Sequence, residues 1–217
     1  MKKIFLSLSL LLFAIPGFTE PIKPVKIDNL VTVSFPTAYQ KKDTSGEQIF
    51  SANGLFGYMA AIRETNAKNN APLNKESDLN KVLKDYVNGI QGQAEGSSAQ
   101  YVRDTTIGAL KAKIFTLKTD NGNSEIQYRN FLLLYTKDAT YTFEYVYPEN
   151  RKDLVKNEYK SFVSSIRLSP ELRRNDQYLS NASGLSTLNK IEIFGGGALI
   201  VILIAVFIAR KQNLSVG

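Results

Sequence analysis

The chain has 217 residues, with 27 Lys and Arg, 20 Asp and Glu, and no histidine, cysteine or tryptophan. Without cysteine and histidine, disulfide bonds, the commonest nucleophile–base pairs and the usual zinc and haem ligation are excluded. The formal net charge is +7, but Lys2, Lys3, Arg210 and Lys211 carry four of these charges, which leaves about +3 on the rest. Such a mild excess is not typical of a nucleic-acid-binding protein.

Residues 1–19 have the pattern of a secretory signal peptide. Lys2 and Lys3 precede a mostly apolar run over residues 4–15, and Pro16 and Gly17 end that run. No cysteine follows that could accept a lipid. We therefore expect an exported domain that begins at Glu20, with an uncleaved N-terminal anchor as the alternative.

A second apolar segment lies near the other end of the chain. Residues 193–209 are uncharged, and as a helix they span roughly 25 Å, the lower end of what crosses a membrane. Arg210 and Lys211 follow at once, which favours a cytoplasmic end. The sequence predicts an exported domain over 20–175, a polar tether over 176–190, a single transmembrane helix over 191–209 and a short cytoplasmic tail over 210–217. A buried core helix is the alternative for the apolar segment.

The first half of the domain shows both strand and helix patterns. Val31, Val33 and Phe35 alternate with polar residues and predict a strand that Pro36 ends, whereas residues 41–47 are polar and predict a loop. The Asn53-Gly54 dipeptide between 48–52 and 55–63 predicts a β-hairpin. An amphipathic helix starting near Ser77 is predicted from apolar residues at three- and four-residue spacing: Leu79, Val82, Leu83, Tyr86, Val87 and Ile90.

Four further strands and one helix are predicted in the second half. The strands cover 100–106, 110–118, 124–136 and 139–147, and the helix covers 154–166. About seven strands joined mostly by tight turns, with two helices packed on them, indicate an α+β domain built on an antiparallel sheet.

This order of elements resembles the PsbP-like domain family, an α/β/α sandwich. The resemblance covers residues 28–168 and rests on VSFP at 33–36, TIGALKA at 106–112 and YKSFVSSI at 159–166. The family includes an extrinsic photosystem subunit, periplasmic lipoproteins of the DcrB type and a Ran-binding factor. The chain departs from the lipoproteins in having a C-terminal apolar segment in place of a lipidated cysteine. The matching stretches are core and turn positions, so the resemblance implies a fold and assigns no functional residue.

Several residue groups could carry chemistry, and each has a structural interpretation that we favour. Lys160 with Ser161, Ser164 and Ser165 could form a Ser–Lys hydrolase site or simply the outer side of a helix. Residues 120–125 resemble a calcium loop but lack its acidic spacing, so a turn is expected. The aromatic stripe in the last strand could stack on a ligand or belong to the core: Tyr141, Phe143, Tyr145 and Tyr147.

One candidate binding surface remains. Five basic residues lie on neighbouring predicted strands: Arg103, Lys111, Lys113, Lys118 and Arg129. They could form a face that binds anionic lipid or polymer, but a solvated sheet face is the interpretation that we favour. No cofactor or metal site is predicted. The favoured hypothesis is a non-catalytic binding or accessory module of the bacterial cell envelope that works through protein partners. A histidine-independent envelope hydrolase, or a ligand-sensing subunit that acts through a membrane partner, is the alternative.

Overall fold

The computed structural model describes residues 22–44, 46–66, 71–94, 97–120 and 126–180. The predicted signal peptide (1–19), transmembrane helix (191–209) and tail (210–217) lie outside these residues, as does the tether beyond Ser180. Among the described residues, no helix is both long enough and apolar enough to cross a membrane.

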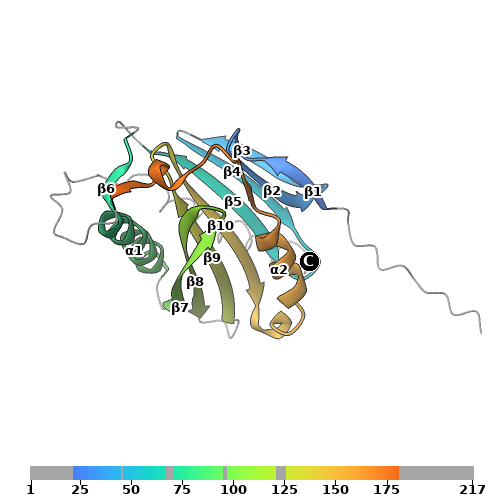
Figure 1. Cartoon of the computed structure of the whole chain (residues 1–217). Helices are drawn as coiled ribbons and strands as arrows, with labels where there is room; N and C mark the ends of the chain where they lie inside the picture. The colour runs from blue at the N-terminus through green and yellow to red at the C-terminus, as the bar shows by residue number, and fades with distance from the viewer. Residues whose placement is uncertain (1–21, 45, 67–70, 95–96, 121–125, 181–217) are drawn as a thin grey trace, which may run out of the picture.

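A seven-stranded antiparallel sheet forms the centre of the domain (Figure 1). Its strands are, from one edge to the other, β3 (Gln40–Thr44), β4 (Glu47–Asn53), β5 (Tyr58–Thr65), β10 (Ala139–Pro148), β9 (Ile126–Tyr135), β8 (Leu110–Asp120) and β7 (Ser98–Ile107). The prediction of an α+β fold with about seven strands in the sheet is confirmed. The predicted hairpin at Asn53-Gly54 is also confirmed, since β4 and β5 pair in antiparallel register.

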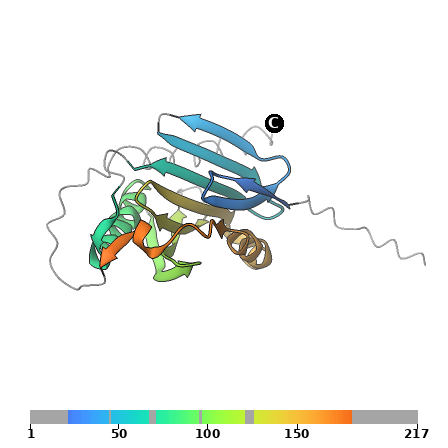
Figure 2. The ribbon, with the colours of Figure 1, turned by 45° about the horizontal axis from the view of Figure 1, so that its top comes forward.

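Smaller elements cover this sheet. A three-stranded sheet contains β1 (Ile22–Lys26), β2 (Val31–Pro36) and β11 (Arg167–Leu168), and a parallel pair joins β6 (Leu73–Lys75) to β12 (Tyr178–Ser180). The described helices are α1 (Glu76–Gly92), α2 (Lys156–Ser164) and the 3-10 turns η1 (Glu149–Arg151) and η2 (Arg174–Asp176). Figure 2 shows the sheet of β1 and β2 lying across the first strands of the large sheet.

Helices α1 and α2 lie on opposite sides of the large sheet (Figure 1). We call these sides the α1 face and the α2 face. On the α1 face, Leu79 and Leu83 of α1 pack against Phe131 of β9. On the α2 face, Phe162 of α2 and Phe35 of β2 pack with Tyr145 of β10. The domain is therefore a sandwich with an apolar core on each side of the large sheet, and Ile49, Ala60 and Ile62 form a further small cluster among the described residues.

Helix α1 forms where the apolar periodicity predicts it. Its predicted apolar residues face the sheet, and its first turn carries Asp78, whose carboxylate accepts a hydrogen bond from the Lys75 N–H at 3.2 Å. A carboxylate in this position satisfies a backbone donor and complements the positive end of the helix dipole. The helix begins one residue before the expected Ser77.

Two predictions about the sheets are wrong. Residues 40–44, in a segment predicted to be a loop from Lys41 onward, form the edge strand β3, in which every side chain is exposed. Such a strand has no apolar alternation to reveal it, and its lysines protect a free edge from further pairing. The predicted strand at Val31 exists, but it belongs to the three-stranded sheet instead of the large one.

The predicted tether starts too early. Residues 176–180 belong to the folded domain, because β12 pairs with β6 and both Gln177 and Tyr178 are buried. This segment is polar and short, so neither composition nor periodicity distinguishes it from a linker.

Candidate functional site

The five predicted basic residues do not form one surface. In an antiparallel sheet, directly opposed residues point to the same face, and neighbours along a strand point to opposite faces. Lys113 lies opposite Leu133, which belongs to the α1-side core. In contrast, Lys118 lies opposite Tyr128, which belongs to the α2-side core.

The same register rule places the other three residues. Lys111 shares the α1 face with Lys113, and Arg129 points to that face because it follows Tyr128 in β9. Arg103 lies opposite Ile114, which packs against the α2-side core. The predicted set therefore divides into three residues on the α1 face and two, Arg103 and Lys118, on the α2 face.

All three residues on the α1 face have acidic partners. Lys111 pairs with Glu76, Lys113 with Asp104, and Arg129 with Glu144. The hydrogen bond between Lys111 and Glu76 raises the pKa of the lysine and lowers the pKa of the glutamate. The Arg129–Glu144 pair is buried, with side-chain exposures of 5% and 0%. Because these cations are neutralised within the domain, they leave little charge for a ligand.

Near Arg103 and Lys118, helix α2 and the turn before it carry three further cations, which the sequence analysis did not identify. Lys152, Lys156 and Lys160 are exposed and follow one another at four-residue intervals through the turn before α2 and the helix itself. Residues at this spacing lie along one side of a helix. The spacing was a usable signal, but lysines on an exposed helix are usually only solvated.

Two contacts place this lysine row beside the sheet. Lys152 Nζ lies 5.4 Å from the centre of the Tyr128 ring, and Tyr128 is the cross-strand partner of Lys118. Further along α2, the Tyr159 ring lies 5.5 Å from the Tyr145 ring of β10. Burial raises the pKa of the Tyr159 phenol, and the guanidinium of Arg103 opposes that rise. We call the five residues that these contacts bring together the α2-side basic surface: Arg103, Lys118, Lys152, Lys156 and Lys160.

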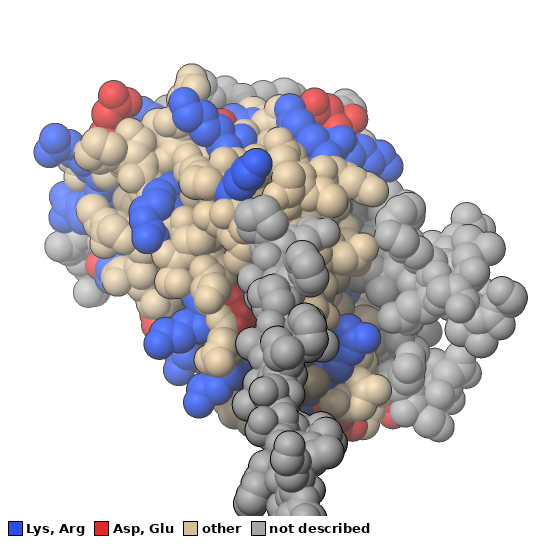
Figure 3. Space-filling view, turned by 90° about the vertical axis from the view of Figure 1, so that its right-hand side faces the viewer, with Lys and Arg blue, Asp and Glu red and all other residues tan. Residues whose placement is uncertain are grey.

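This surface carries unbalanced positive charge. None of its five cations has a carboxylate within ion-pair distance among the described residues. Two acidic residues, Glu149 and Asp153, lie near Lys152 in the chain, and Glu149 accepts a hydrogen bond from the Tyr128 hydroxyl at 3.1 Å. Figure 3 views the molecule from the side that carries β1 and α2, and Lys and Arg outnumber Asp and Glu there. That side of the molecule therefore favours an anionic ligand.

Uncharged side chains lie between the two groups of cations. Ile114, Thr116 and Asn130 are half-buried on the α2 face, where Thr116 Oγ1 donates a hydrogen bond to Asn130 Oδ1 at 2.8 Å. At the free edge of the sheet, a bulge in β7 holds Tyr101 with φ of 54° and 79% exposure. This part of the surface offers hydrogen-bonding groups and an exposed ring beside the cations.

The tyrosine stripe belongs to the core. Tyr141, Phe143, Tyr145 and Tyr147 share the α2 face and are all buried. Burial raises the pKa of Tyr145, and its hydroxyl donates a hydrogen bond to Glu158 Oε2 at 2.7 Å. Glu158 also accepts hydrogen bonds from the backbone N–H groups of Leu55 and Phe56, at 2.6 and 2.9 Å. This carboxylate fixes the β4–β5 turn to α2, which is a structural role.

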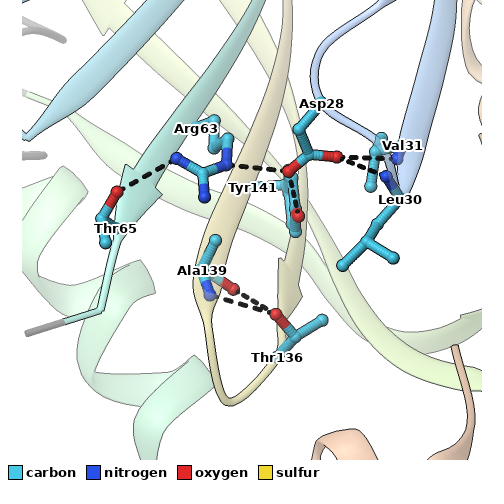
Figure 4. Close-up of polar contacts among 8 residues, drawn as sticks. All are labelled: Asp28, Leu30, Val31, Arg63, Thr65, Thr136, Ala139 and Tyr141. Atoms are coloured by element: carbon cyan, nitrogen blue, oxygen red, sulfur yellow. Dashed lines mark hydrogen bonds and ion pairs between the residues drawn. The ribbon is translucent and has the colours of Figure 1, made fainter. Parts of the chain in front are cut away.

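Asp28 has a similar structural role (Figure 4). Its Oδ1 accepts hydrogen bonds from the Leu30 and Val31 N–H groups at 2.8 and 2.9 Å. Its Oδ2 accepts hydrogen bonds from Arg63 Nε at 2.8 Å and from the Tyr141 hydroxyl at 2.7 Å. Each oxygen has two donors, so the carboxylate is engaged in linking the turn before β2 to the large sheet.

The serines near Lys160 support the structural interpretation. Ser165 Oγ accepts a hydrogen bond from the Ser34 N–H at 2.9 Å and donates one to the Phe162 carbonyl at 2.7 Å. Ser164 Oγ donates to the Ser161 carbonyl at 3.3 Å. Within the described part of the chain, no hydrogen bond joins Lys160 to these hydroxyls. The calcium-like segment mostly lies outside the described residues, at 121–125.

The sequence matches no family model and no curated protein. Among solved structures, the chain is similar to PA94, a protein of unknown function from Pseudomonas aeruginosa, with 12% identity and a TM-score of 0.45, covering 69% of this chain and 98% of that one. It is also similar to LpqN of Mycobacterium tuberculosis, a protein involved in cell envelope biogenesis. The identity is 11% and the TM-score is 0.43, and the match covers 69% of this chain and 91% of LpqN. The PsbP-like resemblance stays a prediction.

Proposed function

We propose that this chain is a non-catalytic binding module of the bacterial cell envelope that holds an anionic partner on its α2-side basic surface. The apolar segment 193–209 attaches the module to the membrane and the folded domain lies outside it. The observation that carries this proposal is a contrast between two sets of cations. Lys111, Lys113 and Arg129 on the α1 face are paired with carboxylates, whereas none of the five cations of the α2-side basic surface has a carboxylate within ion-pair distance among the residues that the structure describes.

The surroundings of these cations fit binding better than catalysis. Lys156 and Lys160 lie on a regular helix, while Arg103 and Lys118 lie on paired strands, so their backbones are held at fixed separations. The nearby carboxylate of Glu158 is occupied by backbone donors and by Tyr145. Fixed charges with an uncharged strip between them attract and orient an anion without transferring a proton.

The test is a matched pair of triple variants of the full-length chain. Lys152→Gln, Lys156→Gln and Lys160→Gln remove three charges from the surface, whereas Lys42→Gln, Lys81→Gln and Lys84→Gln remove three exposed charges from β3 and α1. Each cation near an anionic surface contributes about 1 kcal/mol, so the first triple should weaken binding to immobilised polyanions about a hundredfold. The control triple should change it only a few fold. Equal losses in both variants would show attraction to net charge alone and would refute the placement.

A further inference from the structure

We infer that the α2-side basic surface holds a linear, phosphate-bearing polymer chain lying lengthwise between α2 and β8. This inference rests on the proposed function and names the class of its ligand. Three features of the two groups of cations support it: their lengths, their alignment and their flanks.

The two groups have nearly equal lengths. Lys152 to Lys160 spans eight residues, which is about 12 Å at the helical rise. On the sheet, Arg103 lies opposite Ile114, and Ile114 to Lys118 spans four strand residues, about 13 Å. One extended ligand can therefore contact both groups over their whole length.

The ends of the two groups also correspond. Lys152 contacts the Tyr128 ring, and Tyr128 lies opposite Lys118. Further along α2, the ring of Tyr159, the residue before Lys160, lies 5.5 Å from the Tyr145 ring. Tyr145 lies opposite Asn130, which lies opposite Thr116, so α2 runs from the level of Lys118 towards that of Ile114 and its partner Arg103. The cations therefore form two parallel rows, with Lys152 and Lys118 at one end and Lys160 and Arg103 at the other.

This arrangement suits a repeating anion. Lys156 and Lys160 are about 6 Å apart along the axis of α2, and Lys152 lies in the turn before it, so charge recurs along the ligand path instead of converging on one point. Four of the five cations are lysines, whose compact ammonium groups commonly bind phosphate as point charges. The half-buried Thr116 and Asn130 add hydrogen-bonding groups between the rows.

A flat anionic bilayer fits this surface less well. The exposed apolar residues Leu55 and Leu154 would insert into a membrane interface, but they lie on the other flank of α2. Leu154 is four residues before Glu158, whose carboxylate contacts the Leu55 N–H, so this flank faces the β4–β5 turn. The cation rows and the apolar side chains therefore do not form one membrane-binding surface.

Calorimetric titration of the full-length chain in neutral lipid nanodiscs tests the inference with inorganic phosphate, tripolyphosphate and long-chain polyphosphate. A polyphosphate molecule that contacts both ends of the two rows of cations should bind at least about tenfold more tightly per site than tripolyphosphate, which is shorter than the rows. Lys118→Gln with Lys152→Gln, or Arg103→Gln with Lys160→Gln, should each remove most of that advantage. Thermal unfolding of each variant checks that the domain remains folded.

The other outcomes separate the two proposals. Equal affinity for tripolyphosphate and long-chain polyphosphate would overturn the lengthwise arrangement and leave anion binding intact. Tighter binding of polyglutamate, or of anionic vesicles, than of polyphosphate would overturn the phosphate polymer as ligand class. If no polyanion or vesicle binds, the proposed function fails together with the inference.

Discussion

The side-chain amide of Gln177 forms hydrogen bonds with both backbone polar groups of Lys111. Its Oε1 accepts from the Lys111 N–H at 2.8 Å, and its Nε2 donates to the Lys111 carbonyl at 2.7 Å and to the Tyr135 carbonyl at 2.8 Å. The Gln177 carbonyl also accepts from the Leu73 N–H at 2.8 Å. This fully buried residue joins the C-terminal part of the domain to β8, β9 and β6.

Replacing Gln177 should therefore destabilise the whole domain. Gln177→Ala removes three hydrogen bonds and leaves buried backbone groups without partners, so we expect a loss of about 3 kcal/mol in the free energy of unfolding. Asn175→Ala, an exposed change two residues away, should cost less than about 0.5 kcal/mol. Urea unfolding measures both values. Equal and small losses would show that the domain ends before Gln177.

The buried Arg129–Glu144 pair should be costly to break and inexpensive to replace. Arg129→Met leaves the Glu144 carboxylate without its cation in the α1 face, so we expect a loss of about 3–5 kcal/mol. Adding Glu144→Leu removes the unpaired buried carboxylate, and the double variant should recover more than half of that loss in the free energy of unfolding. A double variant less stable than Arg129→Met would contradict this account of the pair. Denaturant unfolding of the three proteins decides between these results.

Glu47 should make the domain less stable as the pH rises through the weakly acidic range. Burial, followed by the charge of its cross-strand neighbour Glu64, raises the pKa of Glu47 from 4.5 to about 7. The folded state therefore binds the proton more tightly than the unfolded chain. The contribution of Glu47 to the stability of the domain is complete below pH 4.5 and is lost as the pH rises to about 7.

The matching measurement compares wild type with Glu47→Gln, which stays neutral. The free energy of unfolding of the wild type, minus that of the variant, should fall between pH 4.5 and about 7 and should level off on either side. Subtracting the variant removes the contributions of the other carboxylates. Parallel pH profiles would mean that Glu47 titrates alike in the folded and unfolded states.

The proposed membrane attachment has its own test. With residues 193–209, the full-length chain should stay in the membrane fraction after alkaline carbonate washing, because an uncharged segment of this length is long enough to span the bilayer. A variant that lacks these residues should be released. Release of the intact chain by carbonate would exclude an integral anchor and favour the alternative of a core helix.

Much of the fold follows from local sequence patterns. The apolar spacing of α1 and the Asn53-Gly54 turn both identify elements that the structure contains. Strand β3 was missed because a charged edge strand buries no face. Gln177 was missed because its burial depends on distant backbone groups of β8 and β9, which composition does not encode.

The candidate site was only partly predictable. Alternation within β8 alone separates Lys118 from Lys111 and Lys113, since they differ by odd numbers of residues. Placing Arg103 also requires the register of β7 after its bulge. The contribution of Lys152 requires knowing where α2 packs on the sheet. Sequence patterns identify cations, but tertiary packing decides which of them are paired.

Lysine acylation footprinting of the full-length chain, with and without long-chain polyphosphate, tests the central claim most directly. Mass spectrometry reports every lysine at once, so Lys42, Lys81 and Lys84 act as internal controls. The account predicts that polyphosphate slows the acylation of Lys118, Lys152, Lys156 and Lys160. The acylation rates of the three control lysines should stay unchanged. Protection of the controls to the same degree, or no protection of the four, would contradict a binding surface on the α2 face.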